Sequence, residues 1–252
     1  MESWIDYVLV LIHHKKILSL LIVVMMALEW RRGSFKGLVA YAWMVTKDIR
    51  RQTLPVLCVA GVLAACIYGD RYWVDFFQLL SYETPEFWIR LGAHLGDKYL
   101  LIYFLLIYYL FTALKFGSGR KAVAHVVFSC LLAGLFSGVL KLLSTRARPL
   151  AELGPSSFLN FRQGVFGDDG MFQSFPSGDV TIVAAAVFYL MIKFPARIYL
   201  WFLLILPAFT ALSRIQLEKH WPSDAMAAFF LAHAAAIFVA GHESYSKAEK
   251  NS

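Results

Sequence analysis

Long apolar stretches separated by short polar segments dominate the chain, and this pattern predicts a bundle of membrane-spanning helices. A helix needs about 20 mostly apolar residues to cross a bilayer, with roughly 17–25 as the range. Six stretches approach this length, and flanking Tyr and Trp residues extend them at the interfaces. They are Thr53–Gly69, Tyr99–Leu114, Ala122–Leu140, Val180–Phe194, Ile198–Leu212 and Asp224–Gly241. The pattern therefore predicts an all-α integral membrane protein with six transmembrane helices.

The first 51 residues have a weaker and more polar pattern. Leu18–Leu28 is strongly apolar but spans only about half the length that a bilayer requires. We therefore expect residues 1–51 to form a basic, amphipathic segment of one or two interfacial helices. A seventh span that begins near Ile5 is the alternative. The predicted domains are this segment, a six-span core over residues 52–244 and a polar tail over residues 245–252.

The basic residues gather in segments that alternate spans place on one side. Residues 1–51, the segments around Arg120 and Arg197, and the carboxyl-terminal tail sum to a charge of +9. The other connecting segments sum to −2, which accounts for the net charge of +7. Because cytoplasmic loops carry the excess of Lys and Arg, the amino terminus is predicted to be cytoplasmic. The positive charge thus indicates topology, and no nucleic-acid partner is expected.

The composition excludes a disordered chain and disfavours a soluble domain. Of the 252 residues, 59% are apolar and 16% are charged, whereas soluble domains have about 45–50% apolar and about 25% charged residues. The 21 Phe, 12 Tyr and 7 Trp residues supply far more apolar surface than disordered segments contain. Cys58, Cys66 and Cys130 lie in apolar stretches without metal-ligand spacing, so neither a disulfide nor a zinc site is predicted.

Polar sequences converge where three spans meet the predicted outer side. The third span, in which Gly134 and Gly138 are typical of a close helix-packing face, ends in KLLSTRARP at residues 141–149. The fourth span begins after PSGD at residues 176–179. The fifth span ends in SR at residues 213–214, and His220 and Asp224 follow it. Ionisable residues at the ends of apolar helices are costly, so this convergence indicates a functional site.

The residue types in these segments suit an anionic phosphate. Lys141, Arg148 and Arg214 are cations with few acids nearby, and their side chains match phosphate oxygens. Ser177 and Gly178 at a helix start offer backbone N–H groups and the positive end of the helix dipole. Each feature alone is also consistent with a structural role, because basic residues at span ends often extend to the interface.

His220 and Asp224 are four residues apart, so a helical turn would bring them together. An aspartate there can hold the imidazole in one tautomer and leave the other nitrogen free to attack. A cationic cradle beside an oriented histidine predicts phosphoryl transfer through a phosphohistidine, without a metal.

The patterns KxxxxxxRP, PSGx and SRxxxxxHxxxD, in this order, resemble the type 2 phosphatidic acid phosphatase (PAP2) superfamily of lipid phosphatases. The resemblance covers about residues 53–241, and it implies a six-helix membrane core and metal-independent, cofactor-free dephosphorylation of a lipid phosphate or diphosphate. By the family pattern, the phosphate-binding residues are Lys141, Arg148, Ser177, Gly178 and Arg214. The nucleophile is His220, and Asp224 is its partner.

One position departs from the family pattern. The second motif of the family ends in a histidine that protonates the leaving oxygen, and this chain has Asp179 there. Three consequences are open: Asp179 is a weaker acid, the leaving group needs little protonation, or turnover is lost and binding is retained. Arg146 lies within the first motif but outside the matching positions.

We therefore expect a membrane lipid phosphatase of a bacterial inner membrane, with its active site on the periplasmic face. Candidate substrates are phosphatidic acid, phosphatidylglycerol phosphate, undecaprenyl diphosphate and lipid A phosphates. A phosphotransferase of the same fold and a catalytically silent lipid-phosphate binder are the alternatives. The sequence does not indicate an oligomeric state.

Overall fold

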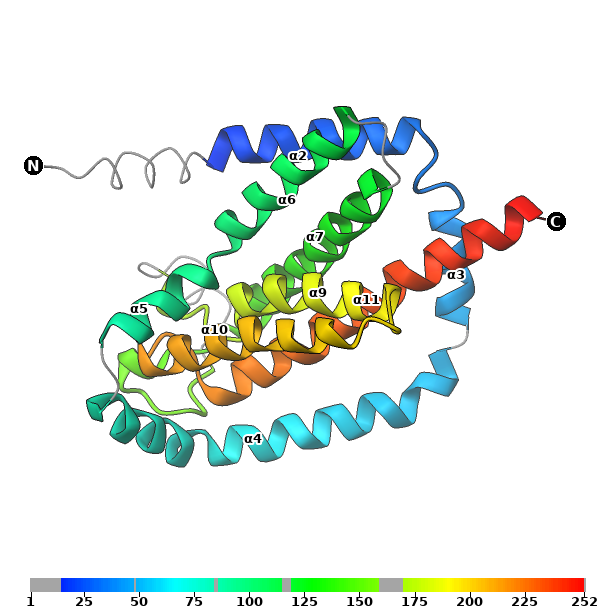
Figure 1. Ribbon diagram of the computed structural model, residues 1–252. Coiled ribbons are helices and arrows are strands. Elements are labelled where there is room, and N and C mark those ends of the chain that lie inside the picture. Colours follow the sequence, from blue (N-terminus) through cyan, green and yellow to red (C-terminus); the bar gives the residue numbers. More distant parts are fainter. Residues whose placement is uncertain (1–14, 48, 84–85, 115–118, 159–169, 252) are drawn as a thin grey trace, which may run out of the picture.

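The computed structural model describes residues 15–47, 49–83, 86–114, 119–158 and 170–251. Within these ranges the chain is helical apart from turns, loops and one isolated bridge between Arg146 and Phe158 (Figure 1). The elements are α2 (Lys15–Arg31), α3 (Leu38–Lys47), α4 (Ile49–Glu83), α5 (Glu86–Leu95), α6 (Lys98–Leu114), α7 (Gly119–Ser144), η1 (Pro149–Ala151), α9 (Gly178–Lys193), η3 (Ile198–Leu204), α10 (Ile205–Gln216) and α11 (Pro222–Asn251). The all-α fold predicted from the sequence is confirmed.

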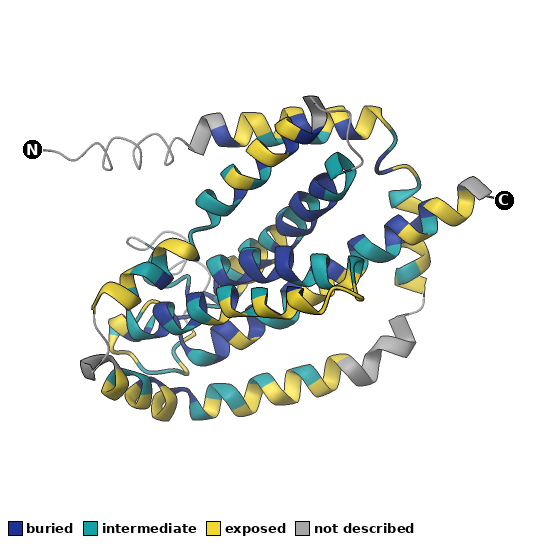
Figure 2. Cartoon of the chain, viewed as in Figure 1, coloured by how far each residue is buried: buried dark blue, intermediate teal, exposed yellow. Residues whose placement is uncertain are grey.

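Small residues allow α7, α9 and α11 to pack closely at the centre of the bundle. One buried cluster consists of alanines from all three helices: Ala133, Ala184, Ala185, Ala232 and Ala235. Since an alanine side chain ends at Cβ, the helix backbones can approach one another. Figure 2 shows α9 and α11 largely buried, whereas α4 exposes much of its surface. The ends of α7, α9 and α11 carry the three polar motifs together with the end of α10, so the packing of these helices positions the site.

Four helical segments are long and apolar enough to cross a membrane, which indicates a membrane-embedded protein. They are Val56–Leu80, Gly119–Ser144, Ile198–Gln216 and Pro222–Glu249. α5 and α6, which are bent by 48° relative to each other, make a fifth if they form one broken span. α9 has 16 residues and falls just below the roughly 17–25 residues of a span. Within the described ranges, the structure thus supports four or five of the six predicted spans.

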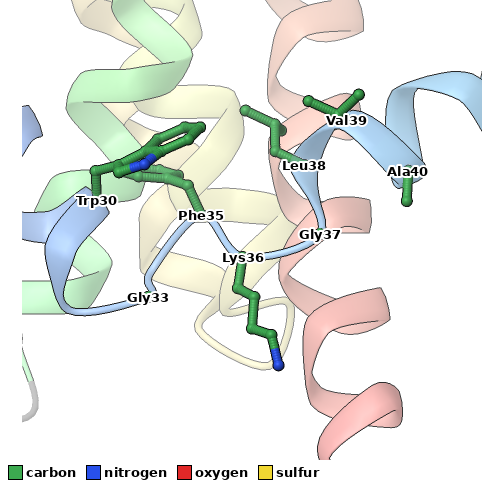
Figure 3. Close-up of a pocket in the computed structure, with 8 residues that line it drawn as sticks. All are labelled: Trp30, Gly33, Phe35, Lys36, Gly37, Leu38, Val39 and Ala40. Carbon is green, nitrogen blue, oxygen red and sulfur yellow. The ribbon is translucent and has the colours of Figure 1, made fainter.

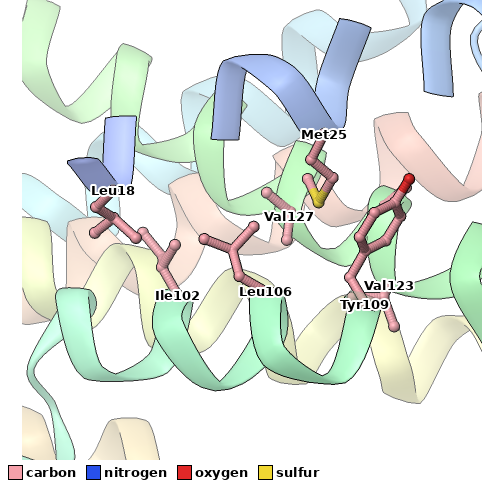
Figure 4. Close-up of a cluster of buried hydrophobic side chains, with 8 residues drawn as sticks. Leu18, Met25, Ile102, Leu106, Tyr109, Val123 and Val127 are labelled. Carbon is pink, nitrogen blue, oxygen red and sulfur yellow. The ribbon is translucent and has the colours of Figure 1, made fainter. Parts of the chain in front are cut away.

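The amino-terminal helix α2 packs against α6 and α7. Their shared cluster is Leu18, Met25, Ile102, Leu106, Tyr109, Val123 and Val127, and Figure 4 shows these side chains pointing toward one another. The interfacial position of α2 and α3 stays a prediction. The alternative span beginning near Ile5 starts outside the described residues.

A turn between α2 and α3 lets the chain continue toward α11. Gly33 and Gly37 adopt φ values of +74° and +76°, which favour glycine. The turn lines a cavity of about 320 Å³ in which Trp30 and Phe35 lie side by side (Figure 3). Beyond the turn, the Tyr41 ring packs on the ring of Phe238 in α11, with 5.2 Å between centroids. α11 itself continues to Asn251, through the segment that the sequence analysis assigned to a polar tail.

Charged residues gather at two opposite ends of the bundle. One end, which we call the far end, contains Glu29, Arg120, Lys193 and Glu243. There Arg120 pairs with Glu29 at 2.9 Å, and Lys193 pairs with Glu243. At the motif end, which contains residues 70, 98, 141–148, 174–179 and 213–224, ion pairs join Asp70 to Arg146 and Asp179 to Arg214. The described residues around Arg120 and Lys193 thus lie away from the motif end. Which side of the membrane each end faces stays a prediction.

Candidate active site

The last turn of α7 and the loop that follows it carry the two cations of the first motif. Lys141 lies in the last turn of α7, and its Nζ donates to the carbonyl oxygens of Gln173 at 2.6 Å and Ser174 at 3.4 Å. The following loop is fixed by a 2.9 Å hydrogen bond from the Arg148 N–H to the Met171 carbonyl. The Nε of Arg148 is buried and has no hydrogen-bond partner among the residues that the structure describes. Buried donors are normally paired, so this atom is available to an anionic ligand.

The second motif forms the amino-terminal start of α9. Ser177 precedes the helix, and its backbone N–H donates to the Asp224 carbonyl at 3.1 Å. The Ser177 hydroxyl is buried and unpartnered, and the first turn of a helix leaves N–H groups without helical acceptors. A Cβ on Gly178 would lie 3.6 Å from Cε of Lys141. The first and second motifs therefore meet at a cationic, donor-rich point, as the sequence predicted.

The third motif adds Arg214 from the last turn of α10. A close approach of α5 fixes this turn, since a Cβ on Gly92 would lie only 2.9 Å from the Ser213 Cβ. The Ser213 hydroxyl donates to the Ile89 carbonyl at 2.7 Å. The Arg214 Nη2 lies 3.1 Å from the Asp179 carboxylate, while its Nε is buried and makes no hydrogen bond to any described residue. A second arginine donor is thus free for an anion.

His220 is almost completely buried, and a backbone carbonyl holds its ring. Its Nδ1 lies 2.8 Å from the Ser174 carbonyl oxygen, whereas the nearest Asp224 oxygen is 3.6 Å away. The sequence analysis assigned the orientation of the imidazole to Asp224, but Ser174 is the closer acceptor. Burial lowers the pKa of His220; repulsion from Lys141 and Arg148 acts in the same direction, and pairing with Asp224 opposes it. The net effect favours a neutral ring.

Asp224 organises the backbone and side chains around His220. Its carboxylate accepts hydrogen bonds from the Trp221 N–H at 2.8 Å and from the Ser174 hydroxyl. Since the carbonyl of Ser174 in turn accepts from His220, Asp224 acts on the imidazole through Ser174 as well as through its own charge. The buried carboxylate is balanced by Arg146, at 2.7 Å.

The sequence analysis left aside two buried residues that support this arrangement, Arg146 and Asp70. The Arg146 guanidinium is fully buried and donates to Asp70 at 2.6 Å, to Asp224 at 2.7 Å and to the Ser223 hydroxyl at 2.7 Å. Asp70 comes from α4 and also accepts from the Ser223 N–H at 2.8 Å. The sequence signal was an acid, Asp70, next to the apolar stretch of α4, and its partner could be identified only from the fold.

Asp179, the residue at the position of the family's histidine, lies between two cations. Its carboxylate is 3.1 Å from Arg214 and 3.4 Å from Lys98, the first residue of α6. Two adjacent cations favour the ionised carboxylate. Lys98 was not among the predicted site residues, because its charge was counted only toward topology.

A cavity of about 360 Å³ leads from this cluster into the side of the bundle. Lys98, Lys141 and Gly178 line its polar end, and the rest is largely apolar, with Ile102, Leu131, Leu135 and Ile182 among the lining residues. Gly134 and Gly138 also line it, and a Cβ on Gly138 would meet no atom within 4 Å. The glycine pair predicted as a close packing face therefore opens space along the helix at Gly138.

Residues 122–246 match the family model described as the PAP2 superfamily. This segment contains all eight predicted site residues, from Lys141 to Asp224. No curated protein and no solved structure matches the chain. The match supports a phosphatase-type activity on a lipid or another phosphate ester, and the chain belongs to the PAP2 superfamily.

Proposed function

We propose that the protein is a membrane lipid phosphatase in which His220 accepts the phosphoryl group and water then releases it. The observation that carries the proposal is the 2.8 Å contact between His220 Nδ1 and the Ser174 carbonyl. A carbonyl oxygen can only accept, so Nδ1 carries the proton and Nε2 keeps its lone pair. The lowered pKa keeps the ring neutral near neutral pH. Both properties suit a nucleophile.

The substrate phosphate binds where the three motifs meet. Lys141, Arg148 and Arg214 supply positive charge, and Ser177 and the first-turn N–H groups after it supply further donors. The buried Nε atoms of Arg148 and Arg214 and the Ser177 hydroxyl have no hydrogen-bond partners within the described ranges of the chain, which supports this assignment. Such preorganised donors stabilise charge as it develops in the transition state.

The reaction proceeds in two displacements at phosphorus. His220 Nε2 attacks, the bond from phosphorus to the leaving oxygen breaks, and a phosphohistidine forms. The Asp224 carboxylate, 3.6 Å from the ring, stabilises the positive charge that the imidazole gains. Water then attacks phosphorus, and the bonding electrons return to Nε2. No step requires a metal or a cofactor.

The cavity beside the site supports a lipid as the substrate. It joins a cationic end to an apolar channel whose lining includes the exposed Leu135. A lipid phosphate has the same order of groups, with a charged phosphate followed by apolar chains. The candidates are phosphatidic acid, phosphatidylglycerol phosphate, undecaprenyl diphosphate and lipid A phosphates. We place the protein in a bacterial inner membrane with the motif end on the periplasmic side, because the basic segments lie at the opposite end.

Phosphate release by the purified full-length protein in detergent tests the proposal, with the four lipid classes as substrates. We expect release from at least one class, and its loss in His220→Ala. Loss of substrate lipid without free phosphate would instead indicate a phosphotransferase. Lipid binding without turnover, unchanged in His220→Ala, would indicate a silent binder and contradict the proposal.

A further inference from the structure

The residue at the position of the family's proton donor is held as an anion. Asp179 Oδ2 lies 3.1 Å from Arg214, and Oδ1 lies 3.4 Å from Lys98. A carboxyl group between two cations stays deprotonated, so it has no proton to give. When the leaving group is an alcohol, its oxygen departs as a strong base and needs a proton from another group.

Lys98 lies on the side of the site where the leaving oxygen must be. It lines the same cavity as Lys141 and Gly178, at the polar end of the channel that contains Ile102 and Ile182. In a lipid phosphate the leaving oxygen joins phosphorus to the apolar part of the molecule. When that part occupies the channel, the oxygen lies at the polar end, close to Lys98.

The other cations at the motif end are poorly suited to give a proton. Arg148 and Arg214 carry guanidinium groups, which do not deprotonate in proteins. Lys141 Nζ gives two of its three N–H groups to the carbonyls of Gln173 and Ser174, which leaves one for the phosphate that it binds. Lys219 is exposed and does not line the cavity. Among the described residues of the cavity wall, Lys98 thus has the donor best placed for the leaving oxygen.

We propose that Lys98 is the general acid of the reaction and that Asp179 is a positioning residue, which holds the Lys98 ammonium by an ion pair. This inference rests on the proposed function. As His220 Nε2 bonds to phosphorus, the bond to the leaving oxygen breaks and Lys98 gives that oxygen a proton, so the lipid departs as an alcohol. Water then attacks the phosphohistidine and gives its proton to the neutral Lys98 amine. Phosphate leaves, and both side chains return to their starting states.

The proposed proton donor indicates a class of substrate as well as a catalytic residue. A diphosphate leaving group is stable as an anion and needs little help from an acid. An acid at Lys98 therefore indicates phosphate monoesters of lipid alcohols, such as phosphatidic acid, as substrates. Replacement of the family's histidine by Asp179 then moves the proton donor to α6 instead of abolishing turnover.

Two substrates that differ in their leaving group test the inference on full-length protein in detergent. Phosphatidic acid needs a proton on its leaving oxygen, whereas p-nitrophenyl phosphate leaves as a stable phenolate. We expect Lys98→Ala to lower kcat for phosphatidic acid by about 10²–10⁴-fold, the usual contribution of a general acid, and kcat for p-nitrophenyl phosphate by less than about fivefold. Lys98→Arg keeps the charge but gives no proton, so the same selective loss is expected with little change in KM.

Two further variants separate positioning from charge. Asp179→Asn removes the anion that orients Lys98, and we expect a smaller loss that is again selective for phosphatidic acid. Lys219→Ala, the matched control, should leave the ratio of the two kcat values unchanged.

An equal loss on both substrates in Lys98→Ala, or wild-type kcat on phosphatidic acid in Lys98→Arg, would overturn the inference. In that case His220-dependent turnover by the wild type would still support the proposed function. A wild type inactive on every phosphate substrate would instead remove the proposed function, and this inference with it.

Discussion

Two buried carboxylates, Glu29 at the far end and Asp224 at the motif end, are each surrounded by arginine and hydroxyl partners. Glu29 accepts from the Ser34 hydroxyl at 2.6 Å and from Tyr109 at 2.7 Å, and it pairs with Arg32 and Arg120 at 2.9 Å each. Burial raises the pKa of Glu29, but these partners outweigh it and hold the pKa below its usual value. These side chains gather around one carboxylate, which ties α2 to α6 and α7.

The motif end has donors that no protein group uses. The Nε atoms of Arg148 and Arg214 and the hydroxyls of Ser177 and Ser137 are buried there without a hydrogen-bond partner among the described residues. The two ends lie on opposite ends of α7, since Arg120 and Lys141 are separated by 21 residues, or roughly 30 Å of helix. The same residue types thus anchor the fold at one end and form an open anion site at the other. At the far end the Nε of Arg120, although it makes no hydrogen bond, lies 2.9 Å from the Glu29 carboxylate, and His125 and His242 each have one buried ring nitrogen without a hydrogen bond. The motif end differs because it gathers two arginine Nε atoms and two serine hydroxyls without hydrogen-bond partners among the described residues.

The largest difference is expected from Arg146→Ala compared with Arg32→Ala. Loss of Arg146 leaves Asp70 and Asp224 buried without their cation, and removal of one partner from a buried ion pair costs about 3–5 kcal/mol. Arg32 is partly exposed, and Glu29 keeps Arg120, Ser34 and Tyr109. Thermal unfolding in detergent should show a large fall in Tm for Arg146→Ala and a small one for Arg32→Ala. Equal changes would contradict the proposed difference between the ends.

Glycine substitutions test open space against close packing. A Cβ on Gly241 would collide with the hydroxyl of Tyr41 at the far end, whereas Gly138 has free space in the cavity. We expect Gly241→Ala to lower Tm and to leave kcat per folded molecule unchanged. Gly138→Leu should keep Tm and reduce kcat/KM for a long-chain phosphatidic acid about tenfold or more, while p-nitrophenyl phosphate is spared. A Gly138→Leu protein with full activity on the long-chain lipid would mean that the cavity does not hold the chains.

Two serine substitutions sharpen the comparison further. Ser34→Ala removes a hydrogen bond to the Glu29 carboxylate, which is worth about 1.5–3 kcal/mol, so Tm should fall while KM stays constant. Ser177→Ala removes a hydroxyl that has no protein partner, so Tm should stay constant and KM for phosphatidic acid should rise several-fold. Unfolding curves and kinetics on the same preparations check both. A raised KM with constant Tm in Ser34→Ala, together with a lower Tm and constant KM in Ser177→Ala, would contradict the assignment of the anchor and the site.

The smallest effect concerns the protonation of His220. Because burial lowers its pKa, the ring stays neutral as pH falls and becomes charged only below the ordinary histidine value of about 6.5. Nitrogen NMR of labelled histidines, assigned with His220→Asn, should show a proton on Nδ1, none on Nε2 and a titration below pH 6.5. A titration above that value, or a proton on Nε2, would contradict the proposed nucleophile.

The sequence predicted the helical fold and the convergence of the three motifs, because apolar length and charge placement follow directly from residue order. Three features required the structure. α9 has 16 residues, so whether it crosses the bilayer depends on the polar residues that flank it and not on its apolar length alone. The Ser174 carbonyl that holds His220 is a backbone group without a sequence signature. Arg146, Asp70 and Lys98 acquire roles only from partners that are 76, 76 and 81 residues away along the chain.

Trapping of the covalent intermediate tests the central claim most directly. The full-length protein in detergent is mixed with phosphatidic acid that carries a radiolabelled phosphate, and the reaction is quenched in base within its first turnover. We predict label on the protein at His220, at up to one phosphate per chain, that is stable in base, lost in acid and absent in His220→Ala. Free phosphate that forms without labelled protein, at the same rate in His220→Ala as in the wild type, would contradict the account.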